Sequence, residues 1–214
     1  MGLKANVRII VADDHGIVRM GLIQTIQRLR PDAIIIEVED FKSLYKVILK
    51  EELDLAIMDV NMPNGSVQEA IDYIKMHQPD LRILIFSSQD EEVYAMRYLK
   101  MGAGGYLSKQ SSNAVVETAL TAMLSTGRFA SDNVKEAMFL ESINGTTKSS
   151  PFEALSDREL QIANKLAEGL PLKEISNQLN LHSSTISTYK NRLFEKLKIR
   201  SIPELVEILR LYNQ

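Results

Sequence analysis

Five side chains that can handle a divalent cation and a phosphoryl group stand at the ends of short apolar runs in this chain of 214 residues. They are Asp13, Asp14, Asp59, Ser87 and Lys109. Neighbouring carboxylates repel one another unless a cation lies between them, and oxygen ligands of this kind suit Mg²⁺. A hydroxyl and an ammonium can then bind phosphoryl oxygens while a carboxylate forms an acyl phosphate. Because the chain has no cysteine, thiolate sites and disulfides are excluded, and Asp59 is the expected covalent acceptor.

These residues meet only if the apolar runs before them form one sheet. The runs span 7–12, 33–38, 55–60 and 82–87, with a weaker one at 105–107. Short, almost continuously apolar and β-branched runs are typical of parallel strands that are covered on both faces. Segments with helical spacing separate them. The pattern predicts a doubly wound α/β domain, (βα)5, with a five-stranded parallel sheet, and ligands in such sheets bind beyond the carboxyl ends of the strands.

The alternation stops after the fifth helical segment, and a second domain follows. Residues 128–141 either extend that helix or form one of their own, and 142–151 are polar, as in a linker. We expect a first domain over 1–125, a linker over 126–150, and an all-α domain of four helices over 151–214. Ser156 and Glu159 form a capping box at the start of the first of these helices.

A basic stretch in the second domain points to a polyanionic partner. Residues 151–214 carry a net charge of +1 on a chain whose total is -3, and cations gather at Lys190, Arg192, Lys196, Lys198 and Arg200. A short helix, a turn and a helix over about 184–197 match helix-turn-helix geometry. On that helix, short polar side chains face away from the apolar side and suit base edges. The alternative is an ordinary helical hairpin with a solvated basic face.

The first domain closely resembles the receiver domain of bacterial two-component response regulators. The resemblance rests on residues 13–15 (DDH), 58–63 (MDVNMP), Ser87 and 102–109 (GAGGYLSK). It implies that Asp59 takes a phosphoryl group from the phosphohistidine of a sensor histidine kinase. One departure is the loop at 64–66, which is about two residues shorter than is usual in the family.

The same resemblance assigns a role to each remaining site residue. It implies that Asp13, Asp14, Asp59 and the backbone carbonyl of Asn61 bind Mg²⁺, that Lys109 and Ser87 engage the phosphoryl oxygens, and that Tyr106 moves with Ser87 on activation. The helical domain resembles the LuxR-type helix-turn-helix through residues 155–159, 166–170, 173–176 and 185–197. This implies groove-facing Ser187, Thr188 and Asn191, with Lys190 and Arg192 near the DNA backbone.

Together the two domains resemble the NarL/FixJ class of response regulators. The expected function is that of a cytoplasmic transcription regulator, not an enzyme with its own substrate. Phosphorylation of Asp59 would promote dimerisation and binding to promoter DNA, with RNA polymerase as a further partner. No apolar run approaches the roughly 20 residues of a membrane span, so no membrane partner is expected. Two alternatives remain, a DNA-binding regulator with a protein-gated receiver that needs no phosphate and a flavodoxin-like enzyme that binds a phosphorylated cofactor.

Overall fold

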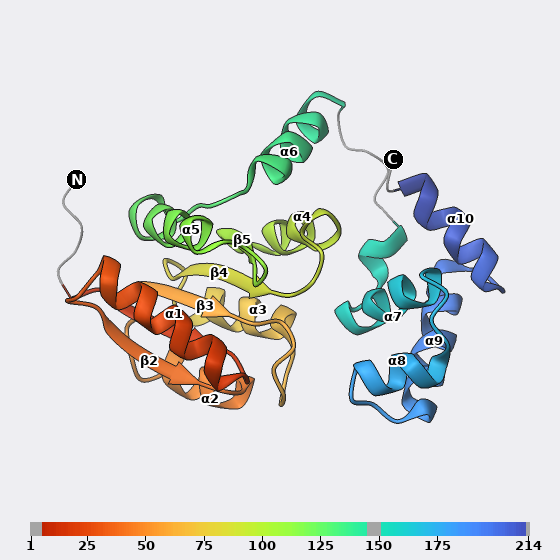
Figure 1. Cartoon of the computed structure of the whole chain (residues 1–214), viewed down its shortest axis with the longest axis horizontal. Helices are drawn as coiled ribbons and strands as arrows, with labels where there is room; N and C mark the ends of the chain where they lie inside the picture. Colours follow the sequence, from red (N-terminus) through yellow and green to blue (C-terminus); the bar gives the residue numbers. More distant parts are fainter. Residues whose placement is uncertain (1–5, 145–150, 213–214) are drawn as a thin grey trace. The chain divides into compact units, whose positions relative to one another are not determined.

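Five parallel strands form a single sheet in the N-terminal unit (Figure 1). The computed structural model describes residues 6–144 and 151–212. Its strands are β1 (Arg8–Ala12), β2 (Ile34–Val38), β3 (Leu55–Met58), β4 (Arg82–Ser87) and β5 (Gly105–Ser108). The strand order is β2-β1-β3-β4-β5, so the winding reverses between β1 and β3. The five-stranded parallel sheet expected from the apolar runs is therefore confirmed, and its switch point lies beside the carboxyl ends of β1 and β3.

The register of the sheet brings the strand ends level with one another. Ala12, the last residue of β1, pairs with Met58 at the end of β3, and Ser87 of β4 pairs with Ser108 of β5. Asp13, Asp59 and Lys109 each directly follow one of these paired residues.

Five helices connect and cover the strands. They are α1 (Gly16–Leu29), α2 (Phe41–Ile48), α3 (Val67–His77), α4 (Glu91–Met101) and α5 (Asn113–Thr126). Helices α1 and α5 pack against each other and share one core cluster with the sheet, to which they contribute Leu22, Ile26, Leu120 and Met123. Helices α2 and α3 also pack together, and α4 contacts β5.

The shortened loop at 64–66 is packed against the start of α2. Asn64 donates a side-chain hydrogen bond of 2.9 Å to Asp40, the residue that caps α2. A Cβ atom at Gly65 would lie 2.7 Å from the Cβ of Phe41, so glycine is required there by close approach. Ser66 then caps α3 by accepting from the Glu69 N–H. The short loop thus follows the surface of α2 directly into α3.

A further helix, α6 (Asp132–Asn144), occupies much of the segment that the sequence marks as a linker. Gly127, in the left-handed conformation with φ of 74°, ends α5, so 128–141 do not extend that helix. Phe129 then pairs with the backbone of Gly104 and Gly105 beside β5. On α6 itself Val134 is buried, while Phe139, Leu140 and Ile143 are exposed. The rest of the expected linker, 145–150, lies outside the described residues.

The C-terminal unit, which begins at Glu141, is entirely helical after α6 within the residues described. A 3-10 turn (Pro151–Ala154) precedes α7 (Asp157–Ala167), α8 (Leu172–Gln178), α9 (Ser183–Leu197) and α10 (Ile202–Tyr212). Leu160, Ile175, Ile186, Leu193 and Leu205 are buried on these four helices, and α7 packs against α8, α9 and α10. The four-helix domain expected from the sequence is confirmed. Among the helices over 6–144 and 151–212, none is long and apolar enough to cross a bilayer.

Candidate functional site

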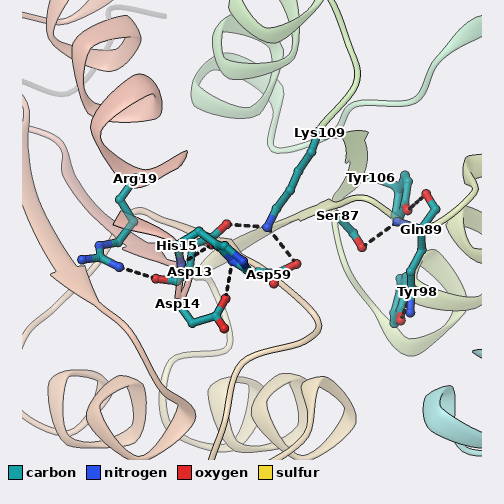
Figure 2. Close-up of polar contacts among 10 residues, drawn as sticks. All are labelled: Asp13, Asp14, His15, Arg19, Asp59, Ser87, Gln89, Tyr98, Tyr106 and Lys109. Atoms are coloured by element: carbon teal, nitrogen blue, oxygen red, sulfur yellow. Dashed lines mark hydrogen bonds and ion pairs between the residues drawn. The ribbon is translucent and has the colours of Figure 1, made fainter. Parts of the chain in front are cut away.

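Two buried carboxylates and one lysine meet where β1, β3 and β5 end (Figure 2). Asp13 and Asp59 are only 1% and 2% exposed. The ammonium nitrogen of Lys109 lies 2.7 Å from Asp13 Oδ2 and 3.3 Å from Asp59 Oδ1. The residues come from three different strand ends, as the parallel sheet requires, and they form an acidic pocket with one fixed positive charge.

The charge in this pocket is not balanced. Within the described part of the chain, Asp13 Oδ2 and Asp59 Oδ1 are buried and accept no well-aligned hydrogen bond, although both face the Lys109 ammonium. Burial raises the pKa of Asp59; Lys109 opposes this rise and the charge of Asp13 adds to it. Ligand atoms of Asp13, Asp14, His15 and Asp59 all lie within 4.8 Å of one another. Unsatisfied carboxylate oxygens at this spacing fit a divalent cation that prefers oxygen ligands.

His15 also belongs to this cluster, although the sequence analysis assigned it no role in the site. It occupies the N-cap position of α1 without a capping bond from its side chain, and its backbone N–H donates a hydrogen bond of 2.9 Å to Asp13 Oδ1. Its ring Nδ1 also lies 2.7 Å from Asp14 Oδ1. Arg19, one turn into α1, donates 2.6 Å to the backbone carbonyl of Asp13. These contacts fix the turn after β1 and hold Asp13 inward while Asp14 stays exposed. Asn61 lies half-buried after Asp59, and its carbonyl role stays a prediction.

A second cluster lies beyond the end of β4, where Ser87, Gln89, Tyr98 and Tyr106 are all buried. The Gln89 N–H donates 3.1 Å to Ser87 Oγ, and Tyr106 donates 2.7 Å to the Gln89 backbone carbonyl. Tyr98 donates 2.9 Å to the side-chain carbonyl of Gln89 (Figure 2). Burial raises the pKa of Tyr106 far above its usual value, so its hydroxyl stays a donor. Sequence reasoning missed Gln89 and Tyr98 as partners of the two expected switch residues, Ser87 and Tyr106.

Helix α9 presents a polar face on the C-terminal unit. Thr188, Asn191 and Arg192 are exposed, whereas Ser187 and Lys190 are half-buried. Ser187 and Thr188 donate hydrogen bonds to backbone carbonyls one turn earlier, and the ammonium of Lys190 lies 5.4 Å from the centre of the Phe194 ring. Ile186, Leu193 and Leu197 are buried on the opposite face, with Tyr189 half-buried beside them. All five residues expected to contact DNA therefore lie on one helix, and their DNA contacts stay a prediction.

Lys196 has a different setting from the one expected for a cation that binds phosphate. Its ammonium lies 2.6 Å from the Oε2 atom of Glu159, a buried residue on α7. The same oxygen accepts hydrogen bonds from the backbone N–H and the hydroxyl of Ser156. Ser156 Oγ in turn accepts from the Glu159 N–H, which completes the capping box predicted at the start of α7. The Glu159–Lys196 pair thus joins the end of α9 to the start of α7.

The chain matches two family models, one for each unit. Residues 9–121 match the model of the response regulator receiver domain. Residues 153–209 match that of the bacterial regulatory proteins of the luxR family. These ranges contain the acidic pocket and α9, respectively.

Curated proteins and solved structures agree with the family models over nearly the whole chain. Response regulator UvrY of Escherichia coli K12 is 30% identical and matches 94% of this chain and 93% of its own. Response regulator GacA of Pseudomonas aeruginosa is 29% identical, with 93% of each chain matched. RcsB of Salmonella enterica serovar Typhimurium, solved on the rprA promoter with the phosphomimetic BeF3⁻, is 27% identical with a TM-score of 0.60, covering 96% and 98% of the two chains.

A second structure, the RcsB–DNA complex, has a TM-score of 0.57 and 27% identity and covers 97% of this chain and 99% of that one. Receiver and luxR-type models account for most of the sequence, and UvrY is matched over nearly its whole length. This chain is therefore a two-component response regulator of the NarL/FixJ class, with a receiver domain followed by a LuxR-type DNA-binding domain.

Proposed function

We propose that phosphorylation of Asp59 by a sensor histidine kinase switches this chain into a dimer that binds promoter DNA. The observation that carries the proposal is the pairing of Asp59 with Lys109 and Asp13 in one buried pocket. An Asp59 carboxylate oxygen attacks the phosphorus of the phosphohistidine, the bond from phosphorus to imidazole breaks, and the imidazole leaves with the electron pair. The product is an acyl phosphate on Asp59.

The residues around Asp59 have the properties that this transfer needs. Asp13, Asp14, Asp59 and the backbone carbonyl of Asn61 would hold Mg²⁺, which neutralises charge on the phosphoryl oxygens when it is bound. Lys109, which now faces two carboxylates, can pair with a phosphoryl oxygen without leaving the pocket. The hydroxyl of Ser87 can donate to another phosphoryl oxygen and thereby sense the modification.

The DNA-binding part of the proposal rests on α9 and on the RcsB structures. RcsB has been solved as dimers bound to DNA. In this chain, Asn191 and Thr188 are exposed on α9 and suit base edges, with Ser187 beside them. Arg192 and Lys190 supply charge for phosphates. A regulator that binds a promoter in this way works in the cytoplasm and meets RNA polymerase there.

The acceptor role of Asp59 is tested with acetyl phosphate and Mg²⁺ on the full chain. Intact mass should rise by one phosphoryl group, the modified peptide should contain Asp59, and chelation of Mg²⁺ should remove the signal. Asp59→Ala should gain nothing. An equal gain in Asp59→Ala, or no gain in the native chain, would refute the proposed acceptor.

A further inference from the structure

The turn of chain from Gln89 to Glu91, which leads into α4, contacts both the switch tyrosine and the residue just before α6. Gln89, just before α4, binds Tyr106, and Glu91, the first residue of α4, binds Ser131 just before α6. We propose that this turn is a mechanical link through which the state of Asp59 controls the first turn of α6. The proposal rests on the proposed function, because it needs a receiver that changes state on phosphorylation.

Gln89 holds three groups at the receiver end of the link. Its N–H donates to Ser87, its backbone carbonyl accepts from Tyr106 and its side-chain carbonyl accepts from Tyr98. The two tyrosine rings stack with centroids 6.0 Å apart. Gln89 is only 8% exposed, yet its side-chain Nε2 has no hydrogen-bond partner among the described residues. A buried donor without a partner destabilises this arrangement, so its free energy lies closer to that of a rearranged one.

Ser131 holds the α6 end of the link. Its hydroxyl donates 2.9 Å to Glu91 Oε2 and accepts 3.3 Å from the Val134 N–H in the first turn of α6. The acceptor on Glu91 therefore orients the hydroxyl that satisfies a free N–H at the start of α6. Phe129, two residues earlier, pairs with Gly104 and Gly105 directly before Tyr106. The entry to α6 is thus attached to α4 and to the start of β5, the strand that carries Tyr106.

These contacts form a continuous path from the phosphorylation site. When the Ser87 hydroxyl turns toward a phosphoryl group, Gln89 loses the acceptor for its N–H, and the Gln89 carbonyl that holds Tyr106 shifts with it. Asp90 and Glu91 follow in the same turn of chain, so the shift reaches the Glu91 carboxylate. Ser131 then loses its acceptor and the first turn of α6 opens.

Amide hydrogen exchange on the full chain tests this link, with beryllofluoride and Mg²⁺ as the probe. In the native chain, the probe should speed exchange in the first turns of α6 by about fivefold, the size expected from loss of one helix cap. Glu91→Ala removes the acceptor, and Ser131→Asp keeps a capping oxygen but removes the donor. Both variants should lose the response of α6 while the segments after β3 and β5 still respond.

Glu92→Ala is the matched control, because it removes the same charge from the same turn at an exposed position without a contact to Ser131. It should respond as the native chain does. An α6 response that survives in both Glu91→Ala and Ser131→Asp would overturn the link, as would a native α6 that ignores a probe bound at Asp59. If no segment around Asp59 responds either, the proposed function itself fails and the link fails with it.

Discussion

The ion pair between Glu159 and Lys196 should stabilise the folded DNA-binding domain. Replacement of Lys196 by methionine keeps most of the volume of the side chain and removes its charge. Glu159, with a side chain 4% exposed, then keeps its two hydrogen bonds from Ser156 but loses its only ion pair among the described residues. A buried carboxylate without a counter-charge is unfavourable, so α7 and α9 should open more readily.

The size of the effect follows from the burial of the two partners. Removal of one partner from a fully buried pair costs about 3–5 kcal/mol. The side chain of Lys196 is 41% exposed, so water screens the pair and the expected loss is smaller. We expect about 2 kcal/mol, the range of one charged hydrogen bond. That loss corresponds to roughly 30-fold faster opening, since about 1.4 kcal/mol is a factor of ten.

Amide hydrogen exchange of peptides from α7 and α9 measures this loss in the full chain, with receiver peptides as an internal reference. Lys173→Met, which removes an exposed lysine from α8, is the matched control and should leave exchange unchanged. A Lys196→Met variant within twofold of that control would refute the reasoning.

The effect should also depend on pH. Burial tends to raise the pKa of Glu159, but Lys196 and Ser156 outweigh it and lower the pKa below the ordinary value of 4.5. A lowered folded-state pKa means that the pair stabilises fully above pH 4.5 and that this stabilisation is lost as pH falls through the folded-state value. The difference in the exchange rates of α7 and α9 between the native chain and Lys196→Met should therefore become smaller under acid conditions. A difference that grows as pH falls would contradict the lowered pKa of Glu159.

Three further perturbations have defined outcomes. Gly104→Ala should destabilise the receiver by at least about 2 kcal/mol in urea denaturation, because its Cβ would lie 2.3 Å from a backbone carbonyl. The control Gly21→Ala, which has open space at its Cβ, should be neutral or stabilising. Gln78→Met should cost about 2–3 kcal/mol by the same assay, since the side chain bonds three backbone groups around the end of α2. Asn191→Ala should weaken binding to DNA selected from a random pool by about tenfold, with little change on unselected DNA; an equal loss on both would contradict base reading.

Local patterns were sufficient to predict the elements and much of the site. Apolar runs marked the strands, and the Ser156–Glu159 spacing marked the start of α7. The pocket could be predicted because parallel strands end at the same edge, which brings Asp13, Asp59 and Lys109 together whatever their separation along the chain.

Contacts that depend on tertiary packing could not be read in this way. Lys196 lies 37 residues from Glu159, and only the packing of α9 on α7 reveals that the lysine pairs with this buried carboxylate. Gln89 contacts Ser87 and Tyr106 through its backbone N–H and carbonyl, which almost every residue type has. Helix α6 was ambiguous because apolar side chains lie all round it, although Gly127 was a local signal that α5 stops before it.

We propose above all that the state of Asp59 controls DNA binding. The most direct test measures affinity for pool-selected DNA with and without beryllofluoride and Mg²⁺, in the native chain and in Asp59→Ala. We expect the probe to tighten binding by at least about tenfold in the native chain, a coupling of the size usual between two linked sites, and to have no effect on Asp59→Ala. Equal affinities in all four measurements would contradict the account and favour a regulator whose receiver needs no phosphate.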